Sequence, residues 1–285
     1  FKKYINKIIK NERSFLIISF CLIPDIYNSL LFTPNKKISS IRANNIDSYY
    51  YSFGFFGYLL GMLHYLLLNL MDKVIVMHKP MHKQISNYLL NKKKIICIPN
   101  FLEKNNIDYK RAFPSIDRFK IIFVGSLDKR KDPLSLIEPI KDLIKKGYKI
   151  YLDIYGEGLL RENLEKKITD QKLENNIFIR GYSKNIKEHL LDSHLMILPS
   201  WSEGLPRSCL EALECGVPCV LRDFYGNKDV IKPKINGLLF NENSELVSII
   251  EYFIKKFDYN KKRESLLPFK YERENIIKYY QDLIS

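Results

Sequence analysis

Between residues 118 and 222 the chain alternates short apolar runs with charged, helix-like segments, and most of the apolar runs end at a glycine or a proline. Short apolar runs of this kind are typical of strands that are buried on both faces of a sheet. Strand, glycine and helix in repetition indicate an open sheet of parallel strands. We therefore predict strands over 120–124, 149–155, 176–180, 195–199 and 218–222, separated by helices over 133–146, 159–169, 186–192 and 208–215.

The first half of the chain shows the same alternation less completely. The polar stretch 101–117 contains Pro114 and is the expected linker between two domains. Ligands of open parallel sheets bind beyond the C-terminal ends of the strands, where the glycine and proline turns fall. Strand candidates in this half are 14–20, 38–41, 73–77 and 94–99.

The charge of the chain is unevenly distributed. The net charge is +14, and residues 1–117 carry 17 Lys and Arg against 7 Asp and Glu. A basic first half indicates an anionic partner, such as a membrane surface, a pyrophosphate-bearing lipid or a nucleic acid. A general bias toward Lys, Asn and Ile explains the charge equally simply. Because motifs that interleave aromatic and basic residues are missing from the sequence, we expect no nucleic-acid partner.

The cysteines argue for a reducing compartment. The chain has five, an odd number, and none of them is spaced as C-x-x-C. A disulfide framework or a zinc site is therefore not expected, and the thiols are interpreted as small apolar residues. This fits a cytoplasmic protein.

The stretch 53–71 is almost continuously apolar and long enough to be considered as a membrane span. It is interrupted by Gly54, Gly57, Gly61 and His64. Three interpretations stay open: a membrane-spanning helix, a helix lying on a membrane surface, and a helix buried in the protein core. We favour the buried helix.

The stretch 199–218 carries the strongest chemical signal. A strand ends at Pro199, and Pro206 lies just before a predicted helix, where a first-turn proline is tolerated. The amides of Arg207, Ser208 and Cys209 then form the N-terminus of that helix. Free amides at this position, together with the helix dipole, predict an anion site suited to a diphosphate.

Two glutamates flank this helix start. Glu211 lies about one turn into the helix, within reach of the ribose hydroxyls of a bound nucleotide. Glu203 precedes Gly204 on the loop, where a sugar bound to that nucleotide would lie. We therefore interpret both carboxylates as ligand-binding groups.

These residues resemble the E-x7-E motif of family-4 retaining glycosyltransferases with the GT-B fold, an α/β fold of two Rossmann-like domains that face each other across a cleft. The resemblance covers residues 120–240, with several motifs in the family's order. They are Val124-Gly125-Ser126-Leu127 with Lys131, Tyr155-Gly156-Glu157-Gly158, Ile179-Arg180-Gly181-Tyr182, Glu203-Gly204-Leu205-Pro206 with Leu210-Glu211-Ala212, and Asn236-Gly237-Leu238-Leu239.

The resemblance implies a role for each matched residue. Glu203 binds donor-sugar hydroxyls and stabilises positive charge at the anomeric carbon, and Lys131 neutralises the diphosphate leaving group. Ser126 replaces the family's usual arginine, for which the neighbouring Arg130 is a candidate substitute. The implied donor contacts are Gly125, Ser126, Arg130, Lys131, Arg180, Tyr182, Glu203, Gly204, Leu205, Pro206, Arg207, Ser208 and Glu211.

The resemblance also implies a domain order. Residues 1–117 form the acceptor-side domain with the linker, 118–262 the donor-binding domain, and 263–285 a helix returning to the first domain. We expect the first domain to lack its opening strand and glycine-rich loop, because Phe1 aligns well inside it. Arg42, in a stretch resembling the family's S-x-R-x-N, is expected on the acceptor side, with a purely structural role as the alternative.

The expected activity is transfer of a sugar, with retention, from a nucleotide-sugar to a saccharide acceptor on a lipid. The resemblance implies a UDP-sugar donor, with a GDP-sugar as the open alternative. Lipopolysaccharide or capsule assembly on the cytoplasmic face of the plasma membrane is the expected setting, with an anionic membrane surface as a further partner. No cofactor or metal is expected, since a D-x-D motif is missing from the sequence. The alternative is an incomplete or non-catalytic nucleotide-sugar-binding protein.

Overall fold

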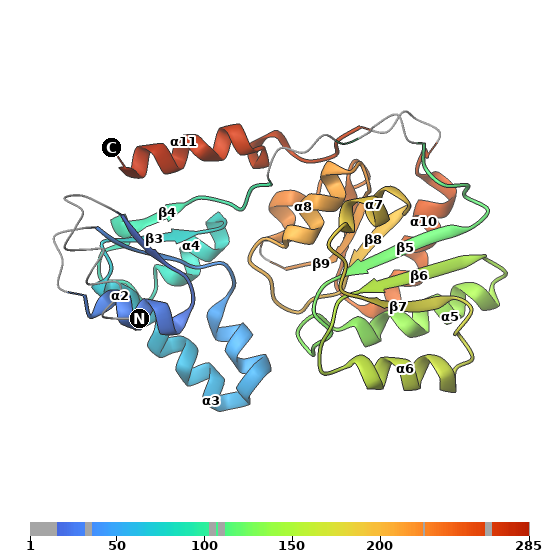
Figure 1. The fold of residues 1–285 in the computed structure, drawn as a ribbon, viewed down its shortest axis with the longest axis horizontal. Helices are drawn as coiled ribbons and strands as arrows, with labels where there is room; N and C mark the ends of the chain where they lie inside the picture. The colour runs from blue at the N-terminus through green and yellow to red at the C-terminus, as the bar shows by residue number, and fades with distance from the viewer. Residues whose placement is uncertain are drawn as a thin grey trace. The chain divides into compact units, whose positions relative to one another are not determined.

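The computed structural model describes residues 16–31, 36–102, 107, 112–224, 226–259 and 264–284. It divides into two compact units, each built on one parallel sheet (Figure 1). Unit 1 consists of Phe1–Asn100, Ser202–Leu205 and Glu274–Ser285, and unit 2 of Phe101–Trp201 and Pro206–Arg273. The predicted α/β class is confirmed.

Unit 1 contains four parallel strands in the order β1-β2-β3-β4, and its core is formed by the sheet together with buried helix side chains such as Tyr65 and Ile85. Each strand matches one of the four predicted runs, with β2 beginning one residue before the predicted 38–41. Ser14 and Phe15 of the first run lie outside the described residues. The strands are β1 (Ile17–Ser19), β2 (Lys37–Ser40), β3 (Lys73–Val76) and β4 (Ile95–Cys97). The helices are α2 (Leu22–Ser29), α3 (Asn45–Leu67), α4 (Lys79–Ile85) and α11 (Arg273–Ile284), with the short 3-10 helices η1 (Leu68–Leu70) and η2 (Lys92–Lys94).

Helix α3 is a hairpin of two helical segments. The backbone of Gly54 has φ +61° and ψ −142°, a left-handed conformation that ends the first segment. A Cβ atom on Gly57 would lie 1.9 Å from the carbonyl oxygen of Tyr49. In a continuous helix, residues eight positions apart are separated by about 12 Å along the axis. The segments 45–53 and 55–67 therefore pack side by side.

This hairpin corrects the interpretation of 53–71 as a buried core helix. At its turn, Phe53, Phe55 and Phe56 are 63%, 73% and 71% exposed. By length and composition alone, Asn45–Leu70 is apolar enough to cross a membrane. Each half of the hairpin is shorter than the roughly 20 residues that a helical span requires. The segment is therefore neither a buried helix throughout nor one straight span.

Unit 2 contains six parallel strands in the order β10-β9-β8-β5-β6-β7. The chain runs from β5 outward to β7 and then returns to β8 on the other side of β5, so the sheet has its topological switch point between β5 and β8. All five predicted strands are confirmed. The strands are β5 (Phe119–Val124), β6 (Ile150–Tyr155), β7 (Ile177–Gly181), β8 (Leu195–Leu198), β9 (Cys219–Arg222) and β10 (Gly237–Phe240).

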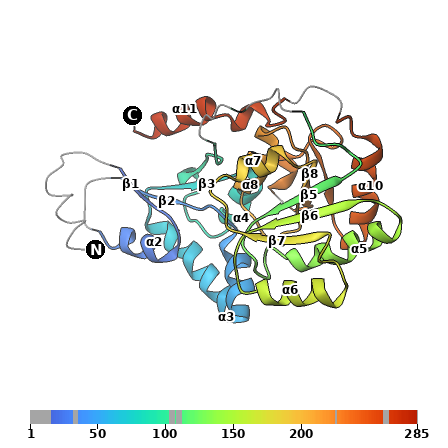
Figure 2. The same cartoon turned by 45° about the vertical axis from the view of Figure 1, so that its right-hand side comes forward.

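Helices cover both faces of this sheet. Helices α5, α6 and α10 lie on one face, and α7 and α8 on the other (Figure 2). The four helices predicted from the sequence are present, within a few residues of the expected bounds. The elements are η3 (Pro133–Leu136), α5 (Ile137–Lys145), α6 (Arg161–Asp170), α7 (Ile186–Leu191), α8 (Arg207–Glu214), α9 (Asn227–Val230), η4 (Asn243–Glu245), α10 (Leu246–Lys256) and η5 (Phe269–Tyr271).

Candidate active site

The loop after β5 is held against the loop after β6 by close backbone contacts. The amide of Gly125 donates to the carbonyl of Tyr155 at 3.0 Å. Gly156 has φ +146°, and a Cβ atom there would lie 1.8 Å from the carbonyl oxygen of Gly125. Only glycine fits this approach, so the glycine turn after β6 fixes the β5 loop. Within that loop the Ser126 hydroxyl donates to Asp128 at 2.6 Å.

Lys131 lies over the start of the same loop. Its amide donates to Oδ1 of Asp128 at 2.8 Å. A Cβ atom on Gly125 would lie 3.4 Å from Lys131 Cδ and 3.5 Å from Cε, so the aliphatic chain passes across the glycine. The lysine therefore lies at the switch point, on the β5 side. This is where the open sheet would bind a ligand.

The β8 side of the switch point is joined to this loop. The amide of Trp201 donates to the carbonyl of Arg130 at 2.8 Å, and its indole Nε1 donates to Asp132 at 3.1 Å. Burial raises the pKa of the Asp132 carboxyl above its ordinary value, and the charge of Arg222 opposes that shift. The two loops that border the switch point are therefore bonded to each other.

Arg222, which the sequence analysis missed, is a buried residue that forms hydrogen bonds beside these loops. Only 4% of this residue is exposed. Its guanidinium donates to the carbonyl oxygens of Pro199 at 3.1 Å and Asn241 at 2.9 Å, and to the side chain of Asn243 at 2.8 Å. The sequence signal that could have found it is an arginine ending an apolar strand in a chain where lysine predominates.

Helix α8 begins at Arg207 with Pro206 as its N-cap residue, which has no side-chain capping bond. The amide of Cys209 donates to the carbonyl of Pro206 at 3.1 Å. The prediction of three free amides is therefore wrong for Cys209, because the first turn is tight. The amides of Arg207 and Ser208 remain the candidates for binding an anion at this helix end.

Glu211 and Arg207 line a pocket of about 370 Å³ beside this helix start. Nε of Arg207 donates to Oε1 of Glu211 at 3.0 Å. The Arg207 side chain is 68% exposed, whereas that of Glu211 is 14% exposed. Sequence reasoning missed the other lining residues, and the only signal for all of them except Leu102 is that they come soon after β7. The other lining residues are Leu102, Lys184, Asn185, Ile186, Lys187 and Glu188.

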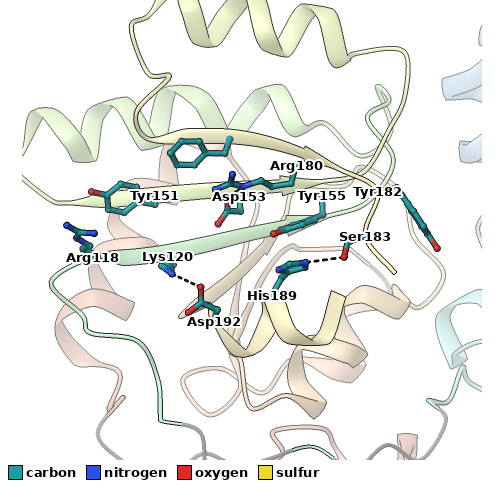
Figure 3. Close-up of a pocket in the computed structure, with 11 residues that line it drawn as sticks. Arg118, Lys120, Tyr151, Asp153, Tyr155, Arg180, Tyr182, Ser183, His189 and Asp192 are labelled. Carbon is teal, nitrogen blue, oxygen red and sulfur yellow. Dashed lines mark hydrogen bonds and ion pairs between the residues drawn. The ribbon is translucent and has the colours of Figure 1, made fainter. Parts of the chain in front are cut away.

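Arg180 and Tyr182 line a different pocket, of about 570 Å³, on the face of the sheet (Figure 3). Nε of Arg180 donates to Asp153 on the neighbouring strand at 2.5 Å, and its guanidinium lies 4.5 Å from the Phe178 ring centroid. The Arg180 side chain therefore lies along the face of the sheet, where it contacts Asp153 and Phe178. Tyr182 is 77% exposed at the C-terminal end of β7, where the chain passes from this pocket to the smaller one.

The loop Ser202–Leu205 belongs to unit 1, together with Arg42. A Cβ atom on Gly204 would lie 2.0 Å from the carbonyl oxygen of Arg42. The carbonyl of Leu205 accepts from Asn100 Nδ2 at 2.8 Å. Glu203 is only 8% exposed. The glutamate is therefore presented by a loop that is fixed at the two residues directly after it.

The guanidinium of Arg42 is engaged within unit 1. It donates to Asn100 Oδ1 at 2.5 Å and to the hydroxyl of Tyr280, on α11, at 3.0 Å. These bonds support the structural role that the sequence left open for Arg42. Among the residues that the structure describes, no group of three or more His, Cys, Asp or Glu could hold a metal ion.

The profile described as "Glycosyl transferases group 1" matches residues 103–267, more than half of the chain. The chain belongs to this family. The group 1 glycosyl transferase profile thus covers the β5 loop, the glycine turn after β6 and helix α8. The family resemblance seen in the sequence motifs is confirmed.

Two relatives of this group 1 glycosyl transferase are named for transfer to a poly(ribitol-phosphate) and to a sugar on diphosphoundecaprenol. One is the poly(ribitol-phosphate) alpha-N-acetylglucosaminyltransferase of Staphylococcus aureus, 24% identical over 99% of this chain and 57% of that protein. Another is the UDP-Gal:alpha-D-GlcNAc-diphosphoundecaprenol alpha-1,3-galactosyltransferase of Escherichia coli, 31% identical over 58% of this chain and 46% of that protein. The chain spans about half the length of these relatives.

A solved structure has the same fold. HepE of Anabaena, in complex with UDP and glucose, matches with a TM-score of 0.80 at 15% identity, covering 99% of this chain and 81% of HepE. This likeness confirms the GT-B fold.

Proposed function

We propose that this group 1 glycosyl transferase moves a sugar from a UDP-sugar to a saccharide acceptor carried on a lipid, with retention at the anomeric carbon. The setting is surface-polysaccharide assembly at the cytoplasmic face of the plasma membrane. The observation that carries the proposal is the pocket lined by Arg207 and Glu211 at the start of α8. The UDP bound to HepE and the UDP-Gal and diphosphoundecaprenol in the Escherichia coli relative's name support the donor and acceptor classes.

The pocket chemistry fits a nucleoside diphosphate. The mostly buried Glu211 carboxylate accepts hydrogen bonds from ribose hydroxyls, and the amides of Arg207 and Ser208 face the phosphates. Arg207 is 68% exposed and adds a cation at the pocket rim. Ion pairing with Arg207 keeps the carboxylate oriented before the ligand arrives.

Lys131 stabilises the charge of the diphosphate leaving group. In the reaction, the bond between the anomeric carbon and the β-phosphate oxygen breaks, and a bond from the acceptor oxygen to that carbon forms on the same face. The leaving phosphate oxygen takes the acceptor's proton, so that UDP departs and no protein nucleophile is needed. Negative charge grows on that phosphate in the transition state, where the Lys131 ammonium and the α8 N-terminus stabilise it.

Glu203 acts on the sugar part of the donor. It binds the hydroxyls of the donor sugar and stabilises the positive charge that develops on the anomeric carbon. The rigid loop fixed by Gly204 and Leu205 holds its carboxylate in one position. Preorganisation of this kind lowers the reorganisation needed during the reaction.

Thermal unfolding with and without UDP or GDP tests the donor site. At a nucleotide concentration 100 times Kd, binding stabilises the folded chain by about 2.7 kcal/mol, a shift of a few degrees. We expect UDP to shift the native chain and to shift Glu211→Gln much less. Glu165→Gln is the matched control, because Glu165 also accepts from an arginine one turn away, Arg161, outside the pocket. A larger thermal shift with GDP than with UDP would replace uracil by guanine as the base of the donor. Equal UDP-induced shifts in the native chain, Glu211→Gln and Glu165→Gln would refute the site.

Release of UDP from UDP-sugars, with a lipid-linked saccharide acceptor, tests catalysis. Transfer that depends on Lys131 and Glu203 supports the proposal. Binding of UDP without any turnover would instead support the alternative, a non-catalytic nucleotide-sugar-binding protein.

A further inference from the structure

The turn of the α3 hairpin presents a continuous group of exposed aromatic and aliphatic side chains. Nine of the 22 exposed large apolar side chains among the described residues lie within 50–70. Such a concentration marks an interaction surface, because single exposed apolar residues are normally scattered. We call the side chains around the turn the apolar tip: Tyr50, Phe53, Phe55, Phe56, Tyr58 and Leu59.

The hairpin that carries the apolar tip is fixed by close helix packing and by buried hydrogen bonds. A Cβ atom on Gly61 would lie 2.6 Å from Cα of Ile46, so glycines allow the two segments to approach at two successive turns. At the base of the hairpin, His64 is fully buried. Its Nε2 donates to Asp25 at 2.7 Å, and its Nδ1 accepts from Asn45 at 2.9 Å. The inner side of the hairpin is therefore bonded to the rest of unit 1, and the exposed aromatic residues are the outer side of a fixed element.

The charge distribution identifies the chemistry of the partner. The chain contains no Asp, Glu, Lys or Arg from Ser48 to Met71. Outside this uncharged stretch, residues 16–31 and 36–100 carry nine Lys and Arg against three Asp, and one of these, Asp25, is fully buried. An uncharged apolar projection on a basic unit matches a bilayer with anionic headgroups, because apolar burial and electrostatic attraction then act together.

Neighbouring features fit the same partner. Tyr50 and Tyr58 flank the phenylalanines, and tyrosine is enriched at membrane interfaces because its ring is apolar and its hydroxyl is polar. Helix α2 packs against α3 (Figure 1) and exposes Ile23, Tyr27 and Leu30 along one stripe. Both ends of α3 join the sheet of unit 1, so the hairpin dips into one leaflet rather than crossing the bilayer.

We propose that the apolar tip of the α3 hairpin inserts into the interface of an anionic bilayer and anchors unit 1 on that surface. This deepens the proposed function, on which it rests for the lipid-linked acceptor, by naming the element that brings the enzyme to its acceptor. A depth of about 5–10 Å, typical of interfacial elements, is sufficient for the phenylalanines to leave water.

Vesicle co-sedimentation tests the proposal with the full chain. The vesicles are phosphatidylcholine alone, or phosphatidylcholine with about one third phosphatidylglycerol. We expect binding to the anionic vesicles, weakened by salt, and at least about tenfold weaker partitioning for Phe55→Ser/Phe56→Ser. Leu159→Ser/Phe269→Ser is the matched control, because it removes two side chains of unit 2 that are 95% and 71% exposed. This control should bind as the native chain does.

Each other outcome overturns the proposal. Absence of native binding, or equal binding by both double variants, shows that the tip does not engage lipid. Equal binding to the two kinds of vesicle removes the anionic partner. A dimer in size-exclusion chromatography that the tip variant converts to a monomer assigns the tip to a second copy of the chain. The UDP-induced thermal shift, measured on the same samples, reports the donor site separately, so failure of the membrane proposal is distinguishable from failure of the proposed function.

Discussion

The guanidinium carbon of Arg222 lies 3.7 Å from the ring centroid of Trp201, inside unit 2. This stacked pair is where the ends of β8 and β9 meet the loop after β5. Nη2 of Arg222 also lies 3.6 Å from Oδ2 of Asp132, and the same oxygen accepts a hydrogen bond from the indole Nε1 of Trp201. One arginine thus links the strand ends to the loop that carries Lys131.

Arg222→Met should therefore destabilise unit 2 strongly. The change leaves buried carbonyl oxygens, including that of Pro199, without their donor, and removes the cation near Asp132. We expect a loss of about 3–5 kcal/mol, the cost of breaking a buried charged network. Denaturant unfolding of the UDP-bound protein measures it. Arg161→Met, which removes an exposed arginine paired with Glu157, should change stability by less than about 1 kcal/mol. Equal losses in both variants would contradict the role given to Arg222.

Gly204→Ala should separate donor binding from transfer. The added Cβ atom would lie 2.0 Å from the carbonyl oxygen of Arg42, so the loop carrying Glu203 must shift. A displacement of about 1 Å at a reacting group can cost on the order of a hundredfold in rate. We expect sugar transfer to fall at least tenfold while UDP still raises the unfolding temperature. Gly147→Ala is the control, since that site has a positive φ but open space around it, and its transfer rate should stay near the native value.

His64→Ala should destabilise unit 1. The variant leaves the fully buried Asp25 carboxylate without its imidazole donor. Removal of one partner of a buried pair costs about 3–5 kcal/mol. Thermal unfolding followed by circular dichroism measures the change. His82→Ala, at a partly exposed position of α4, should lie within about 1 kcal/mol of the native chain. A similar effect of the two substitutions would show that the buried network contributes little.

Asp132 should give unit 2 a pH dependence of defined sign. Burial raises the pKa of this carboxyl above 3.8, so the folded chain binds the proton more tightly than the unfolded chain. The stability that this group contributes is present below pH 3.8 and is lost as pH rises through the raised pKa. The unfolding temperature of the native chain should therefore fall, relative to that of Asp132→Asn, across this window. Parallel pH profiles of the two proteins would contradict the assignment.

The strands and the start of α8 could be predicted because local patterns decide them. Apolar runs such as 195–199 form strands wherever the sheet is buried on both faces, and Pro206 sets the beginning of α8 within one residue. The glycine at position 204 is also visible in the sequence motif, although the backbone contact with Arg42 that requires it is not. The sequence was therefore sufficient for the helix that carries Glu211 and for every strand except β10, whose residues 237–239 were read only as part of a turn motif.

The remaining features depend on contacts that a linear pattern does not contain. The hairpin at Gly54 looks like a continuous apolar helix in sequence, and only the packing of Gly57 on Tyr49 reveals the reversal. Arg42 bonds to Tyr280, 238 positions away, so its structural role could be left open but not decided. Arg222 was missed for the same reason, because its partners come from several strand ends.

Unit 1 is assembled from three separate stretches of the chain, and the last of them is α11. On the ribosome, all of unit 2 emerges before Tyr280 can reach Arg42. Nascent unit 2, a continuous run apart from the short loop 202–205, can condense first, since domains generally fold as units during synthesis. Until then the Arg42 guanidinium has Asn100 but not Tyr280 as a hydrogen-bond partner. The sheet that is encoded first thus makes its contact with α11 only after the whole of the second sheet has been synthesised.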